Sequence, residues 1–131
     1  MRNMQRLSIL FVLFCFLGLT SCSKASLTAR LSLLKAENAY AKAYTLRTQK
    51  DAESLRQTLY HQACDNFQKT YEANPKAFTL NRIVWAADSC LRVKELERAE
   101  QFQIFEEEYT QTHPNETDHG DDAPLMGLEG Q

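Results

Sequence analysis

Apolar side chains recur at three- and four-residue spacing through most of this chain, which is the periodicity of an amphipathic α-helix. Between Cys22 and Pro114 the only proline is Pro75 and there is no glycine, whereas residue types that favour helices are abundant. No stretch alternates apolar and polar residues as a half-buried strand does. The pattern therefore predicts an all-α fold with about four helices, at residues 27–47, 51–73, 77–91 and 93–112.

The first expected helix differs from the others in having two adjoining apolar stripes. One consists of Leu27, Leu31 and Leu34, and the other of Leu33, Ala36, Tyr40, Ala43 and Tyr44. The second expected helix has a single stripe at four-residue spacing, formed by Leu55, Leu59, Ala63, Phe67 and Tyr71.

The breaks between the expected helices have different sequence signals. Pro75 ends the second helix, because the residue before a proline is disfavoured in the α region. Thr48 and Asp51 resemble a capping box with a shorter acid and predict the start of the second helix. No glycine or proline enforces that break, so one continuous helix through residues 27–73 is the alternative. Short connections predict two antiparallel helical hairpins.

The N-terminus has the layout of a secretory signal. Arg2 and Arg6 precede an apolar run at residues 9–19, which is too short for a transmembrane helix of ~20 residues. The ending Leu-Thr-Ser-Cys22 resembles the lipobox of bacterial lipoproteins. In that family the cysteine is alkylated with diacylglycerol, the peptide is cut before it, and the new amine is acylated. The resemblance implies a membrane anchor at Cys22. The alternative is an ordinary secretory signal with a chance cysteine at the cut.

The resemblance also implies a location. The family signals inner-membrane retention with an aspartate after the cysteine, and here Ser23 follows it. We therefore expect an outer-membrane lipoprotein that faces the periplasm of a bacterial envelope. Cleavage removes the first 21 of 131 residues and leaves 110, enough for one small domain.

Charge divides the mature chain into two parts. Residues 22–112 have 13 basic and 12 acidic side chains, so no basic surface indicates binding to nucleic acid. Residues 113–131 have five acidic and no basic side chains, together with all the mature glycines. This composition predicts disorder. The expected organisation is a signal peptide at 1–21, a lipidated tether at 22–26, a helical domain at 27–112 and a disordered acidic tail at 113–131.

Part of the helical domain resembles the second helix of a tetratricopeptide repeat. In that family a small alanine lets paired helices approach, an aromatic residue four positions later packs between them, and a proline after Asn or Asp closes the repeat. Ala63, Phe67, Asn74 and Pro75 stand at the matching spacings. A degraded second copy would end at Pro114. A plain four-helix bundle has the same alanine and aromatic pattern, so both architectures are open.

The chain has no recognisable catalytic or metal-binding motif. We find no phosphate-binding glycine loop, no zinc signature and no Ser-His-Asp order. Of the three histidines, His61 is beside an apolar stripe, and His113 and His119 are in the acidic tail. We therefore expect no enzyme activity, no cofactor and no bound metal.

Trp85 is the main sequence candidate for a contact with a partner protein. It falls on the side of the third helix opposite the main apolar stripe, with Phe78 near it; that stripe consists of Leu80, Ile83, Val84 and Ala87. Exposed tryptophan is a frequent binding anchor. The alternative is that this second face packs against another helix of the same domain.

Cys64 and Cys90 are predicted to form a disulfide. In an antiparallel hairpin that turns near Lys76, the position numbers of facing residues add up to about 152. Those of the two cysteines add up to 154, and an exported protein enters a compartment that permits disulfides. The alternative is a pair of buried free thiols.

These features favour a lipid-anchored envelope scaffold or assembly adaptor, in the broad style of small lipoproteins that help outer-membrane machines assemble. Its partner would be another envelope protein. The alternative is a ligand-binding lipoprotein with a small apolar molecule or lipid between its helices. A cavity lined by Tyr40, Tyr44, Tyr60 and Phe67 would favour that alternative.

Overall fold

The computed structural model describes residue 24 and residues 26–116. Over this part of the chain the fold is all-helical and has no strand, as the periodicity predicts. In chain order, the elements are an N-terminal helix at residues 26–45, η1 (Lys50–Ala52), α2 (Glu53–Ala73), η2 (Pro75–Ala77), α3 (Leu80–Arg92) and α4 (Leu96–Thr112). The predicted signal peptide with Cys22, and the acidic tail from residue 117, lie outside the described residues.

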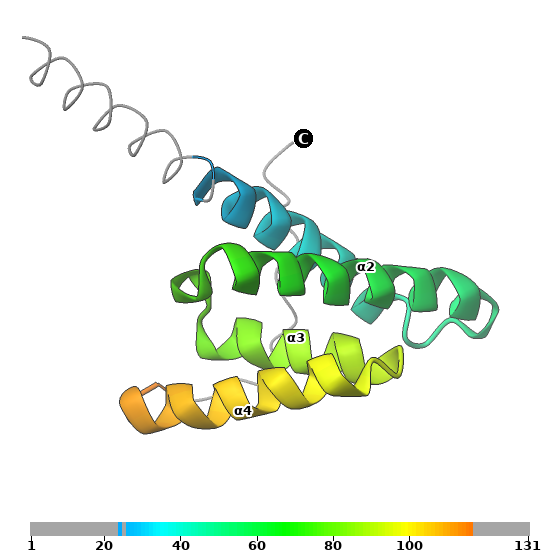
Figure 1. The fold of residues 1–131 in the computed structure, drawn as a ribbon. Coiled ribbons are helices and arrows are strands. Elements are labelled where there is room, and N and C mark those ends of the chain that lie inside the picture. Colours follow the sequence, from blue (N-terminus) through cyan, green and yellow to red (C-terminus); the bar gives the residue numbers. More distant parts are fainter. Residues whose placement is uncertain (1–23, 25, 117–131) are drawn as a thin grey trace, which may run out of the picture.

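The helices form two antiparallel hairpins that stack on one another (Figure 1). The N-terminal helix and α2 form the first hairpin, and α3 and α4 form the second. Helix α3 packs against both α2 and α4, while α4 lies on the far side of the stack from the N-terminal helix. No described helix has the length and apolar character needed to cross a bilayer.

The core combines alanines with large aromatic side chains. Ala36, Ala43 and Ala63 are completely buried, and their small side chains let the first hairpin's helices approach closely. Phe67 and Phe102 are also completely buried and fill the space farther along the stack. On the N-terminal helix, this alanine stripe is therefore the core face, and the neighbouring leucine stripe is left outside.

The break between the N-terminal helix and α2 is present, but the predicted capping box is wrong. No side chain caps the start of η1 or of α2. Instead, Arg56 reaches back from α2 to the turn. Its Nη1 donates to the carbonyl oxygens of Leu46 at 3.0 Å, Arg47 at 3.4 Å and Gln49 at 3.4 Å. One guanidinium thus binds three carbonyl oxygens of the turn between the N-terminal helix and α2.

The turn after α2 is longer than the sequence predicts. Asn74 is extended, its side-chain Oδ1 accepts a hydrogen bond from the Lys76 N–H at 3.2 Å, and Pro75 begins the short helix η2. Helix α3 consequently starts at Leu80, three residues after the predicted position.

The turn between α3 and α4 has the Schellman arrangement. The Glu95 N–H donates to the Cys90 carbonyl at 2.9 Å, and the Lys94 N–H donates to the Leu91 carbonyl at 3.1 Å. Lys94 has a φ of 61°, the left-handed conformation that glycine usually provides at this position. The turn uses residues predicted to be helical, so α4 begins at Leu96 rather than near residue 93.

The first residues of the predicted disordered tail have a defined structure. His113 stacks on Tyr109 with ring centroids 4.1 Å apart. Glu116 accepts hydrogen bonds from the Leu80 N–H at 3.2 Å and from the Tyr109 hydroxyl at 2.8 Å. Residues 113–116 therefore contact the helical domain, because Glu116 supplies an acceptor to an N–H at the start of α3.

Candidate interaction surfaces

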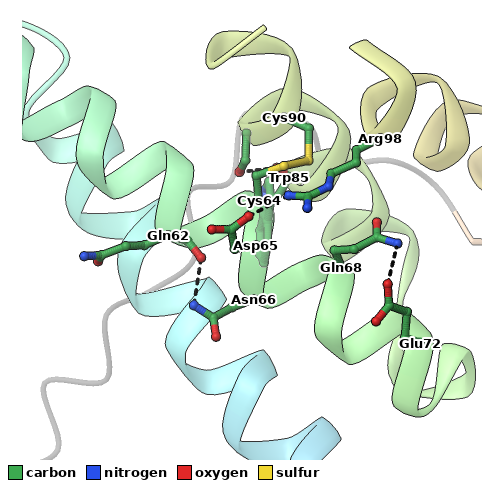
Figure 2. The surroundings of a disulfide bond; sticks show 10 residues. Gln62, Cys64, Asp65, Asn66, Gln68, Glu72, Trp85, Cys90 and Arg98 are labelled. Atoms are coloured by element: carbon green, nitrogen blue, oxygen red, sulfur yellow. Dashed lines mark hydrogen bonds and ion pairs between the residues drawn. A yellow bond between two sulfur atoms is a disulfide. The ribbon is translucent and has the colours of Figure 1, made fainter. Parts of the chain in front are cut away.

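A disulfide between Cys64 and Cys90 joins the two hairpins (Figure 2). The Cα atoms are 4.9 Å apart, and both side chains are completely buried. The antiparallel register of α2 and α3, anticipated from the position of the turn, brings the cysteines together. Beside the disulfide, Arg98 of α4 forms an ion pair with Asp65 of α2, with Nη1 and Oδ1 2.5 Å apart. The hairpins are therefore linked covalently and through α4.

Trp85 packs within the chain, as the alternative interpretation of its helix face anticipated. It is partly buried, and its ring stacks on Tyr40 of the N-terminal helix with centroids 5.8 Å apart. The Tyr40 hydroxyl donates to Asp88 Oδ2 at 3.0 Å. Burial, and then the nearby Asp88 carboxylate, raise the pKa of Tyr40, so the phenol keeps the proton that it donates. An ion pair between Arg82 Nε and Glu37 Oε1, 2.6 Å apart, also joins α3 to the N-terminal helix.

Phe78 is not accessible to a partner as an anchor. It is only 3 % exposed, and its ring lies 6.2 Å from Phe67 and 5.8 Å from Phe102, measured between centroids. The turn after α2 explains this outcome, because its extra residues direct Phe78 into the core before α3 begins.

The tyrosines expected to line a ligand cavity are also occupied in packing. Tyr60 and Phe67 are almost completely buried, and Tyr40 lies against Tyr60 with ring centroids 5.9 Å apart. Arg47 covers the Tyr44 ring at 3.9 Å from its centroid. These side chains therefore fill the space between the N-terminal helix and α2 where the ligand cavity was expected.

One side of α4 forms an open aromatic groove. It has a volume of about 520 Å³ and is lined by Pro75, Lys76, Phe78, Phe105, Glu108, Tyr109, Thr112 and His113. Phe105 is only partly buried although it contacts Tyr71, with ring centroids 5.1 Å apart. The groove thus combines a packed aromatic floor with a side that is open to solvent.

A second, smaller hollow continues this groove across α4. Its volume is about 280 Å³, and its lining includes Glu97, Glu100 and Ile104 as well as Phe105 and Glu108, which it shares with the groove. Ile104 is half exposed in the middle of these carboxylates. The sequence signal that indicates this hollow is the clustering of glutamates around the apolar residue Ile104. We call this combined surface the α4 face.

The N-terminal helix exposes its second apolar stripe on the opposite side of the stack. Leu27, Leu31 and Leu34 are 58 %, 51 % and 57 % exposed, and we call them the leucine face. Exposed single leucines are common, but three at helical spacing form a continuous patch.

The histidines do not create a metal centre in the described part of the chain. No group of three His, Cys, Asp or Glu side chains there could hold a metal ion. His61 is exposed on α2, and His113 is used in stacking on Tyr109. His119 lies outside the described residues.

No protein-family model, curated protein or solved structure matches this chain. The α4 face and the leucine face are therefore defined by their own geometry and charge.

Proposed function

We propose that this chain is a lipid-anchored scaffold or assembly adaptor of the bacterial envelope, and that its α4 face binds a protein partner. The anchor would be Cys22, and the absence of aspartate after it favours the outer membrane facing the periplasm. The observation that carries the binding role is the aromatic groove with its acidic extension along α4.

The α4 face suits a partner segment that combines apolar and basic side chains. Phe105 and Tyr109 offer aromatic surface, which often dominates binding energy in interfaces. Glu97, Glu100 and Glu108 surround this surface and would attract and orient basic residues of the partner. The negative charge also disfavours acidic segments that would otherwise fit the same groove.

The rest of the fold would hold this face in a fixed position relative to the tether. The disulfide joins α2 to α3, and the Arg98–Asp65 ion pair joins α4 to α2. A rigid binding surface loses less conformational entropy on association than a flexible one.

The experiment places a photoreactive amino acid at Ile104 in intact cells, with position 103 as the matched control. Ile104 is half exposed on the α4 face, whereas Gln103 is an exposed neighbour about 100° around the helix. We expect a discrete crosslinked protein from position 104 and not from position 103. Ile104→Arg, but not Gln103→Arg, should abolish a crosslink formed through a probe at Tyr109.

Lipidation is tested separately. Cys22→Ser should stop incorporation of a fatty-acid probe and prevent normal cleavage. Continued labelling of that variant would remove the lipoprotein part of the proposal. Equal crosslinking from positions 103 and 104 would remove the binding part.

A further inference from the structure

We infer that the leucine face of the N-terminal helix lies on the surface of an anionic phospholipid bilayer. This inference rests on the proposed lipid anchor at Cys22 and adds an orientation to it. The anchor would hold the chain at the membrane, and the leucine face would decide which side of the domain meets the lipid.

The first argument is the shape of the apolar patch. Leu27, Leu31 and Leu34 are spaced by four and three residues and lie within about 60° around the helix. The patch is about 10 Å long at 1.5 Å per residue. It is turned away from the core because the alanine stripe of the same helix faces α2 and α3. An apolar stripe along an otherwise polar outer surface is typical of helices that lie in a membrane interface.

The second argument is charge. Lys35 and Lys42 are exposed along one flank of the leucine face, Arg30 is exposed on the other flank, and Lys24 is exposed shortly before the helix begins. None of these four forms an ion pair with a described residue. The single acid of this helix, Glu37, lies toward the core side and is paired with Arg82. A basic residue near an anionic bilayer strengthens association by roughly fivefold.

The third argument is the length of the tether. Four residues lie between Cys22 and Leu27, so the five steps from one Cα atom to the next span at most about 17 Å even when the chain is fully extended. A lipid on Cys22 would therefore keep the start of the leucine face close to the headgroups. The short tether raises the local concentration of the face at the bilayer and leaves little room for another protein to cover it.

The acidic α4 face supports the same orientation. It lies on the far side of the stack from the N-terminal helix (Figure 1), so an anionic surface attracts one side of the domain and repels the other. With the leucine face on lipid, the α4 face points away from the membrane and is open to a partner.

The test uses the lipidated full-length product in vesicles and measures quenching of tryptophan by brominated phospholipids. Leu31→Trp places a reporter on the leucine face, and Leu96→Trp places one on α4, where the replaced leucine is 63 % exposed. Trp85, which stacks on Tyr40 inside the stack, provides a common background in both variants. Mass spectrometry first establishes that Cys22 carries lipid, so failure of the anchor is detected independently.

In vesicles with about one-third phosphatidylglycerol, we expect quenching of the Leu31→Trp reporter to exceed that of Leu96→Trp at least threefold. Replacing Lys35 and Lys42 by Gln should lower the equilibrium constant for contact of the reporter with lipid by roughly 25-fold if the two cations act independently. Equal quenching of the two reporters in a lipidated protein would overturn the inference. If the Leu31→Trp reporter is not quenched and chemical crosslinking yields a dimer, the inference is overturned, because a second copy of the chain then covers the leucine face.

Discussion

Removal of the Cys64–Cys90 disulfide should cost a large share of the stability of this small domain. The perturbation is the double substitution Cys64→Ala and Cys90→Ala, which avoids placing new polar groups in two completely buried positions. The bond closes a loop with a sequence separation of 26 residues. In the chain-entropy model, a crosslink that closes a loop of this length adds about 3.5 kcal/mol to the free energy of unfolding. The double variant should lose that amount.

The assay is urea denaturation followed by circular dichroism, with the oxidised parent protein as reference. A loss of about 3.5 kcal/mol corresponds to a fall in Tm on the order of 14–28 °C for a domain of this size. The total stability of such a domain is about 5–15 kcal/mol, so the double variant should be partly unfolded at modest urea concentrations.

The same disulfide provides a matched control. A reductant should destabilise the parent protein by a similar amount and leave the double variant unchanged. Because both sulfur atoms are buried, reduction should be much faster in urea than in the native protein. A loss below about 1 kcal/mol in the double variant would refute the loop-closure reasoning.

Three further changes test the turns, the core and the start of α3. Lys94→Gly should raise the free energy of unfolding by about 0.5–1 kcal/mol, because glycine adopts a φ of 61° without steric cost. Lys94→Val should lower the free energy of unfolding. Urea midpoints in the opposite order for the two variants would contradict the Schellman assignment. Phe67→Ala should lower the free energy of unfolding by about 3–5 kcal/mol because the ring is completely buried, and a loss under about 1 kcal/mol in thermal melts would disprove its core position. Hydrogen bonds from the Tyr109 hydroxyl and the Leu80 N–H lower the pKa of Glu116 below 4.5. The stability that it contributes is therefore present above pH 4.5 and is lost as the pH falls through the folded pKa. The parent and Glu116→Gln should differ in stability at pH 7 and converge as the pH falls below the folded pKa, and a difference that stays constant with pH would exclude this contact.

The elements set by local periodicity were predictable from the chain, whereas the turns, which depend on particular backbone conformations and side-chain hydrogen bonds, were not. The stripe that contains Phe67 placed α2 correctly, and its register with α3 brought Cys64 and Cys90 together. The start of α3 was misplaced because Pro75–Ala77 form a short helix, which the Asn74 side chain caps by accepting from the Lys76 N–H. The start of α4 was misplaced because Lys94, rather than a glycine, adopts the left-handed conformation.

The candidate site shows a different limit. Helix geometry indicated that Trp85 lies on a second face, but it could not decide whether that face meets a partner or the N-terminal helix. The answer depends on Tyr40, which is 45 residues earlier in the chain and supplies the ring on which Trp85 stacks. Similarly, two adjoining stripes on one helix did not reveal which would face the core. The alanine stripe does so because small side chains permit the closer approach.

The position of the disulfide gives the domain an unequal response to mechanical force. The covalent link joins α2 to α3, while the N-terminal helix is held only by non-covalent contacts, including the Tyr40–Trp85 stack and the Glu37–Arg82 pair. Tension applied through the anchor that we propose at Cys22 would enter the fold at that helix. It would peel residues 26–49 away first and release up to about 80 Å of extended chain. The helices joined by the disulfide would stay folded, so the unfolded first helix would act as an extensible linker between the bilayer and the remaining helices.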